Sequence, residues 1–216
     1  AAPADTSAPW GATLTLQGRQ VELDSAVVLP SGKLTVQAEQ GLTLGDGARL
    51  DLAGRAFTLM DQTRYGWGGD VDLESRHGNI LQTAGSVIDL SARYNQAGRF
   101  SATALDAGAG LIDLRGAILG QASGVYDAGG TVVPFEAGGI ALRAQAVADF
   151  TALNQRLNEG GVTGSRAFQI KRGDLVIGNE VKARRINIAA DGGSLTVNGL
   201  VLSLIHISEP TRPERI

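Results

Sequence analysis

Cysteine is absent from this chain of 216 residues, which excludes disulfide bonds and cysteine-ligated metal sites. Aromatic residues make up only 5% and methionine occurs once, so a buried core must consist mainly of Val, Ile, Leu and Ala. Long apolar runs are also missing, because no stretch approaches the ~20 residues that a membrane-spanning helix needs. These absences predict a chain that does not span a membrane and has a narrow aliphatic core.

Positive charge is scarce and dispersed. Lysine occurs only at Lys33, Lys171 and Lys182, and the formal net charge is −3. Binding to nucleic acid requires clustered cations that displace counterions, so the composition argues against this class of function. The densest basic run, residues 182–185, is short and typical of a solvated strand edge. We therefore expect no nucleic-acid partner.

Glycine, by contrast, is abundant: the chain has 30, about twice the usual share of ~7%. Between the glycines, apolar residues recur as pairs two positions apart, at intervals of roughly seven residues. Such a pair predicts a short strand with one buried face. The N-terminal pairs are Leu14/Leu16, Val21/Leu23, Val27/Leu29, Leu34/Val36, Leu42/Leu44, Leu50/Leu52 and Phe57/Leu59.

Three successive pairs occupy about 20 residues, which is the length of one coil in a solenoid. A coil of three short strands cannot bury its inner face alone, so the stacking of equivalent strands supplies the core. We expect the glycines between strands to permit positive φ at tight corners. The sequence thus predicts an all-β fold, a right-handed parallel β-helix with about three short strands per coil, over residues 1–201.

A phrase of an aliphatic residue, Asp and Leu occurs three times, with its aspartates at Asp51, Asp89 and Asp113. Because side chains alternate along a strand, these aspartates point outward while their neighbours point inward. The repetition favours a structural ladder on the outer surface rather than a catalytic group.

Two stretches interrupt the rhythm. Residues 120–139 contain two glycine pairs and a proline, and are predicted to leave the coil as a loop. Residues 149–161 are predicted to form the one helical insertion, with Asp149 as N-cap and a glycine pair at 160–161 as the end. Phe150, Leu153 and Leu157 fall on one face of that helix. We expect this insertion to pack against the coils.

Residues 202–216 depart from the pattern of the rest of the chain. The segment 202–212 resembles the direct translation of a transposase adapter used in sequencing libraries. This resemblance implies that residues 202–216 are a non-native tail and that the native chain continues differently after about residue 201. His206 then carries no functional meaning.

Three segments resemble filamentous haemagglutinin-like exoproteins: 168–178 (FQIKRGDLVIG), 181–184 (VKAR) and 191–199 (DGGSLTVNG). The run 85–92 (GSVIDLSA) is similar to the repeats of the same family, and the resemblance covers most of residues 12–200. It implies an internal β-helical shaft segment of a very long secreted protein on the bacterial cell surface. Such proteins cross the outer membrane through a dedicated β-barrel transporter (two-partner secretion) and often act as adhesins that contact a cell-surface receptor or glycan.

Candidate sites are few. Asp70, Asp72 and Glu74 alternate along one predicted strand, but the wrapped loop that usually binds calcium is absent, so we predict no metal there. Tyr65 and Trp67 lie in a glycine-rich turn, where aromatic rings either pack over a corner or contact a ligand.

Taken together, the sequence predicts no catalytic, metal or cofactor-binding residue, and it places possible ligand or partner contacts at Tyr65, Trp67, Phe150 and Leu157. Two alternatives to the shaft remain open. One is a carbohydrate-active enzyme such as a polysaccharide lyase, which needs acidic or basic groups that converge on one outer groove. The other is the passenger domain of an autotransporter.

Overall fold

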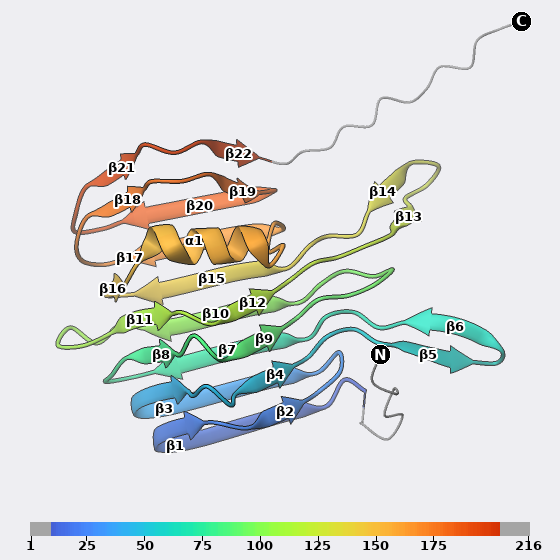
Figure 1. Ribbon diagram of the computed structural model, residues 1–216, viewed down its shortest axis with the longest axis horizontal. Helices are drawn as coiled ribbons and strands as arrows, with labels where there is room; N and C mark the ends of the chain where they lie inside the picture. Colours follow the sequence, from blue (N-terminus) through green and yellow to red (C-terminus); the bar gives the residue numbers. More distant parts are fainter. Residues whose placement is uncertain (1–9, 204–216) are drawn as a thin grey trace, which may run out of the picture.

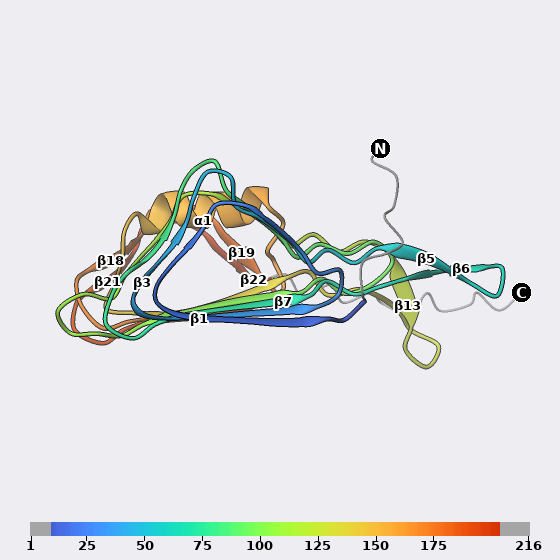
Figure 2. The same ribbon diagram turned by 90° about the horizontal axis from the view of Figure 1, so that it is seen from below.

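The computed structural model describes residues 10–203, which consist mostly of β-strands with one α-helix, so the predicted all-β class is confirmed. The strands lie in layers stacked one above another, and the chain climbs through these layers from the N-terminal to the C-terminal side (Figure 1). Seen from below, successive layers lie over one another as flattened loops (Figure 2).

The largest sheet has ten strands and is parallel throughout. One side of the stack consists of seven of these strands, each paired with its equivalent in the next layer. They are β1 (Thr13–Leu23), β3 (Lys33–Leu44), β7 (Asp70–Ser75), β10 (Arg99–Ala104), β15 (Gly139–Ala144), β17 (Ser165–Ile170) and β20 (Arg185–Ala190).

The sheet is strongly curled, because β3 pairs with β7 through its first half and with β8 through its second half (Figure 2). The second side of the stack consists of the second half of β3 and the strands that pair in sequence after it: β8 (Ile80–Gln82), β11 (Leu111–Leu114) and β16 (Ala146–Val147). A third side has a four-stranded parallel sheet of β2 (Ala26–Val28), β4 (Arg49–Asp51), β9 (Val87–Asp89) and β12 (Ala117–Leu119).

Two further parallel pairs continue these sides near the C-terminal end of the described chain: β18 (Leu175–Ile177) with β21 (Leu195–Val197), and β19 (Val181–Ala183) with β22 (Val201–Ser203). Leu202 and Ser203, which the sequence assigned to a non-native tail, are therefore paired with Lys182 and Ala183. The rest of that tail, including His206, lies outside the described residues.

The core is a set of in-register ladders. In the first side, Leu34 of β3 aligns with Val71 of β7, then with Phe100, Ile140 and Arg166 in the layers that follow. Inward positions alternate with outward ones along each strand, as the burial pattern of β7 and β10 shows. Each fully buried aliphatic side chain contributes about 1.5–3 kcal/mol, so the stacked layers stabilise one another.

The apolar pairs mark these inward positions, with one exception. Both members of the pairs at 34/36, 42/44 and 50/52 are buried, whereas those of β1 are only partly buried because β1 lies at the open end of the stack. Phe57 and Leu59 are 38% and 54% exposed, since they belong to a hairpin of β5 (Ala56–Leu59) and β6 (Gln62–Tyr65). Their alternation fits an antiparallel hairpin strand as well as a core strand, so the prediction for this pair was wrong.

A second hairpin, β13 (Val125–Asp127) with β14 (Val132–Pro134), occupies the stretch 120–139, which was predicted to leave the coil. Both hairpins project from the same side of the stack (Figures 1 and 2). They flank the region in which the candidate site lies.

The helix α1 (Phe150–Glu159) takes the place of a third-side strand between β12 and β19, both of which it contacts (Figure 1). Its N-cap is Asp149, whose Oδ1 accepts a hydrogen bond from the backbone N–H of Ala152 at 2.9 Å. Gly161, with φ of 68°, ends it. Within residues 10–203 the structure has no helix long and apolar enough to cross a membrane.

Five glycines at one corner of the stack, directly before the first-side strands, form what we call the glycine column: Gly32, Gly69, Gly98, Gly138 and Gly164. A Cβ on Gly98 would lie 1.8 Å from the carbonyl oxygen of Gly69, and one on Gly69 would lie 2.2 Å from that of Gly32. These glycines are required by the close approach of backbones in adjacent layers. The sequence predicted instead that glycines at corners are needed for a positive φ. This reason applies to other glycines, for example Gly110, whose φ is 85°.

Candidate binding site

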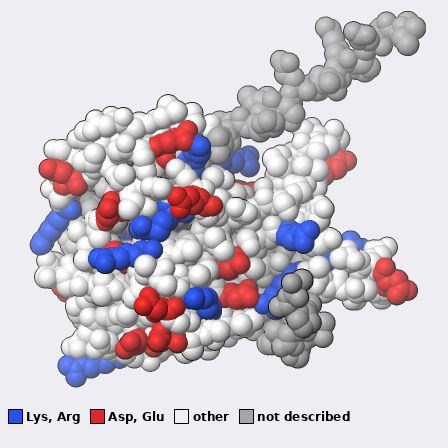
Figure 3. Space-filling model, viewed as in Figure 1, with Lys and Arg blue, Asp and Glu red and all other residues white. Residues whose placement is uncertain are grey.

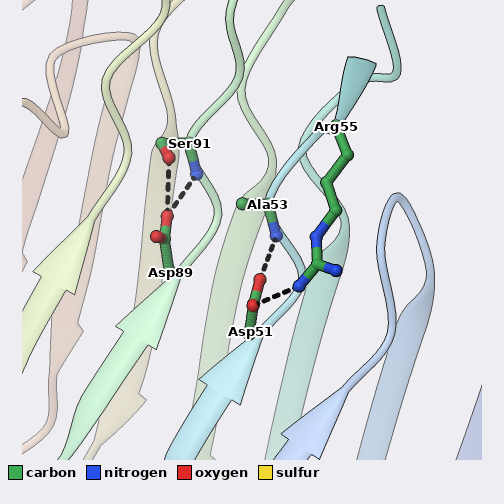
Figure 4. Close-up of polar contacts among 5 residues, drawn as sticks. All are labelled: Asp51, Ala53, Arg55, Asp89 and Ser91. Atoms are coloured by element: carbon green, nitrogen blue, oxygen red, sulfur yellow. Dashed lines mark hydrogen bonds and ion pairs between the residues drawn. The ribbon is translucent and has the colours of Figure 1, made fainter. Parts of the chain in front are cut away.

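The outward aspartates hold local turns. Asp51 and Asp89 are paired in register on β4 and β9. Asp51 accepts hydrogen bonds from the backbone N–H of Ala53 at 3.3 Å and from Nη2 of Arg55 at 2.5 Å. Asp89 accepts from the backbone N–H and Oγ of Ser91 at 2.9 and 2.6 Å (Figure 4). Both carboxylates thus stabilise the chain where it leaves the strand.

Asp113 does not extend this ladder. It lies on β11 and aligns with Leu81 of β8, on the second side of the stack, because the same sequence phrase occurs on different sides in different layers. Its carboxylate accepts a hydrogen bond from Nε of Arg115 at 2.8 Å, which raises the pKa of that arginine. The predicted stack of three aspartates therefore consists of two.

The acidic face of β7 is also engaged with neighbouring strands. Asp72 accepts a hydrogen bond from Oγ of Ser101 at 2.7 Å, and Glu74 accepts one from Nε2 of Gln37 at 3.1 Å. Within residues 10–203, no three His, Asp or Glu side chains are grouped so that they could hold a metal ion. These carboxylates connect layers through side-chain hydrogen bonds.

His77, just beyond β7, lies beside Asp106. Nδ1 of His77 is 3.2 Å from Oδ2 of Asp106, and the backbone N–H groups of Gly108 and Ala109 donate to Oδ1 of the same carboxylate. The hydrogen bond with His77, followed by that from Gly108, holds the pKa of Asp106 below its ordinary value. His77 is exposed and Asp106 is half-buried. The contact tethers a turn, and no nucleophile accompanies it in these contacts.

The helix residues proposed as ligand contacts are part of the core. Phe150 is 6% exposed and packs edge-on against Phe168, with ring centroids 5.0 Å apart. Leu157 is fully buried. Neither side chain presents an appreciable surface to solvent, because the apolar face of α1 fills the interior where a strand would otherwise lie.

The two aromatic residues of the glycine-rich turn have different environments. Tyr65 is half-buried and packs against Tyr94, with ring centroids 4.8 Å apart. Trp67 is 53% exposed and lines a groove. Of the four predicted contacts, Trp67 is therefore placed at a hollow of the surface.

This groove, which we call the rim groove, lies where the hairpins leave the stack. One part, beside Trp67, has a volume of about 290 Å³, and a second part, at the β13–β14 hairpin, has about 280 Å³. The two parts share Gln96 and Glu136. The lining includes Trp67, Asp70, Gln96, Arg99, Glu136 and Ser165 in the first part, and Tyr126, Phe135 and Arg184 in the second.

Three rim segments are joined by backbone hydrogen bonds. The N–H of Gly68 donates to the carbonyl of Gln96 at 2.9 Å, and the N–H of Ala97 donates to the carbonyl of Glu136 at 3.0 Å. These contacts fix the positions of the side chains on either side. Gly98, Gly139 and Ser165, which carry little or no side chain, also line the groove.

The groove has two acidic and two basic side chains, and they differ in their partners. Asp70 accepts a hydrogen bond from the backbone N–H of Arg99 at 3.0 Å, and Glu136 forms an ion pair with Arg185 at 2.5 Å. The guanidinium groups of Arg99 and Arg184 form no ion pair with a side chain among residues 10–203. Two exposed cations are therefore free to meet a ligand.

Elsewhere on the surface the charges are mixed. Lys and Arg lie interspersed with Asp and Glu over the face seen in Figure 3, without a field of one sign. This distribution gives no support for a large electrostatic interface on that face.

Sequence reasoning missed Gln96, Arg99, Glu136, Ser165 and Arg184, because they come from separate segments that only the stacking of layers brings together. One signal was present: glycine recurs directly before the strands that begin at Asp70 and Arg99, and again before Ser165. A repeated glycine at one corner indicates where the surface is lowered, although it does not say which side chains surround that point.

Comparison with protein-family models, with curated proteins and with solved structures finds no match for this chain.

Proposed function

We propose that this chain is a right-handed parallel β-helix that forms a shaft segment of a large secreted bacterial surface adhesin of the filamentous haemagglutinin-like kind. The observation that carries the proposal is the in-register ladder, in which equivalent strands pair in parallel from β1 to β20. Such a stack is extended by adding layers, and each layer is stabilised by its neighbours. That is the physical property a long surface rod requires.

The side chains support a mechanical role. The outward carboxylates of Asp51, Asp89 and Asp113 are each engaged by groups within four residues of them in the chain. Those of Asp72 and Glu74 bind groups on adjacent strands. Their contribution is to hold turns and layers in place, and in this proposal the shaft carries out no catalysis.

Secretion supplies the expected partners. A chain without cysteine can pass unfolded through an outer-membrane β-barrel transporter without a disulfide that would hold a loop closed. On the cell surface, in this proposal, the stack assembles layer on layer, and a host or bacterial receptor or glycan is the partner.

The proposal is tested by the gene and by export. Sequencing the contiguous locus is expected to show a long reading frame with further coil repeats and a neighbouring gene for a transporter of the two-partner type. Co-expression of the whole reading frame with that transporter should place the protein outside the cell, where added protease degrades it. A locus without such a transporter, or a full-length product that stays inside the cell when the transporter is present, contradicts the proposal.

A further inference from the structure

The rim groove differs from the rest of the outer surface in its combination of groups. Exposed aromatic rings lie at both ends of the groove, Trp67 at one end and Tyr126 at the other. Tyr126 packs against Phe135, with ring centroids 5.1 Å apart. Polar side chains lie between them, with glycine and serine also in the lining. Aromatic faces with hydrogen-bonding groups between them suit a ligand that has both CH faces and hydroxyl groups, which is the surface of a sugar ring.

The charged side chains of the groove indicate which class of ligand it favours. Arg185 balances the charge of Glu136, whereas Asp70 accepts a backbone N–H and keeps its negative charge. Arg99 and Arg184 are exposed and without an ion pair among residues 10–203, so their two positive charges exceed the one negative charge of Asp70. A guanidinium presents a planar pair of donors that matches a carboxylate. The groove therefore favours an anionic ligand over a neutral one.

The distance between layers indicates how long a ligand must be to contact both arginines with separate groups. Arg99 begins β10 and Arg184 directly precedes β20, so three steps through β15 and β17 separate them along the stack. At ~4.8 Å for each step between strands, the two backbones lie ~14 Å apart. An extended chain of several sugars spans this backbone separation and can place a separate carboxylate on each guanidinium.

We infer that the rim groove binds an extended oligosaccharide that carries carboxylate groups, laid along the stack with its carboxylates on Arg99 and Arg184 and a sugar face on Trp67. The inference deepens the proposed function, on which it rests for its biological role, because it gives the shaft itself a contact surface for acidic glycans. In this arrangement the stack positions the contacts, and no bond in the ligand is made or broken.

Calorimetric titration of the whole chain with galacturonic acid oligomers of one to six units tests the inference, with a neutral glucose hexamer as the matched ligand. The acidic hexamer is expected to bind at least about tenfold more tightly than the acidic monomer and the neutral hexamer, since it presents a separate carboxylate to each arginine. Equal binding of the acidic and neutral hexamers, or no binding of the acidic hexamer, overturns the inference.

Variants of the lining locate the site. Arg99→Gln, Arg184→Gln and Trp67→Ala should each weaken binding of the acidic hexamer about tenfold, whereas Arg143→Gln, an exposed arginine of β15 outside the groove, should change it less than about twofold. All three lining residues are exposed, so circular dichroism and the melting temperature are expected to stay unchanged. Binding that survives both arginine substitutions places the site elsewhere and overturns the inference.

The same samples separate this inference from the proposed function. Intact hexamer recovered after prolonged incubation supports a binding shaft. Shortened or unsaturated products that disappear in the Arg99→Gln variant support a ligand in the groove but contradict the non-catalytic shaft, in favour of a polysaccharide lyase. If the protein is exported through the transporter but binds no acidic oligomer, the shaft function is supported and only the inference about the rim groove is overturned.

Discussion

The guanidinium of Arg166 donates a hydrogen bond from Nη1 to Oδ1 of Asn154, and both side chains are buried inside the stack. Arg166 stands in a ladder that is otherwise apolar, between Ile140 and Ile186. Its Nε also donates to the carbonyl of Val162 at 3.0 Å, and burial lowers its pKa to about 10. The arginine thus connects β17 to the helix that replaces a strand.

Asn154 extends this connection into the next layer, because its Nδ2 donates to Oδ1 of Asn179 and to the carbonyl of Glu180, both at 2.7 Å. We predict that Asn154→Leu lowers the free energy of unfolding by about 2 kcal/mol, since it leaves a buried guanidinium short of an acceptor. Arg166→Met removes the same bond from the other side. A double-mutant cycle by urea unfolding should give a coupling energy of about 1 kcal/mol or more.

The matched control for that cycle is Arg143→Met, which removes an exposed arginine from the adjacent strand β15 and should pair additively with Asn154→Leu. If the effects of the two buried substitutions are additive, Arg166 and Asn154 stabilise the fold independently. That result would contradict the predicted coupling through their hydrogen bond.

The glycine column makes a prediction about close backbone approach. Gly98→Ala places a Cβ 1.8 Å from the carbonyl oxygen of Gly69, so it should destabilise the fold by about 3 kcal/mol as the layers are forced apart. Gly41→Ala, within β3, meets no atom closer than 3.8 Å and should change stability by less than about 1 kcal/mol. Urea unfolding compares the two, and equal destabilisation would mean that loss of flexibility rather than contact between layers governs both.

The Asp106–His77 contact predicts a pH dependence. Hydrogen bonds to the carboxylate depress the pKa of Asp106 in the folded protein. The ionised carboxylate therefore contributes to stability at pH values above the pKa of Asp106 in the unfolded chain. This contribution is lost as the pH falls through the pKa of Asp106 in the folded protein. Carbon NMR titration should find Asp106 ionising below the ordinary value of 3.8, and His77→Gln should move it upward.

Asp191 serves as the internal control for that titration. Its pKa is lowered by hydrogen bonds from Lys171 and Gln169, at a different site, so His77→Gln should leave it unchanged. If the pKa of Asp106 does not respond to the substitution, its depression has another cause than the imidazole.

The sequence predicted the elements whose signal is local. The paired Leu34 and Val36 identify a strand with one buried face, and Asp149 with Gly161 delimits the helix, because alternation and capping depend on neighbouring residues. Phe57 and Leu59 show the limit of this reasoning, since an exposed hairpin strand has the same alternation.

Arg166 and the rim groove could not be predicted in this way. An arginine at an inward position of β17 contradicts the apolar pattern, and its partner Asn154 lies on the preceding helix. The groove depends on which residue of one layer lies above which residue of another. That register is set by the lengths of the insertions between strands, and periodicity in the sequence does not report them.

The central claim is that equivalent strands lie in register, one layer above the next. The absence of cysteine allows nitroxide labels on engineered cysteines at outward positions of one ladder: Thr35 with Ala167, Thr35 with Asn187, and Thr15 with Asn187. These pairs are four, five and six strand steps apart, so their backbones lie ~19, ~24 and ~29 Å apart. The distances between labels measured by pulsed electron paramagnetic resonance should increase by ~4.8 Å with each step. A constant increment of about one strand spacing supports the stack, whereas distances that do not increase with the number of layers would contradict it.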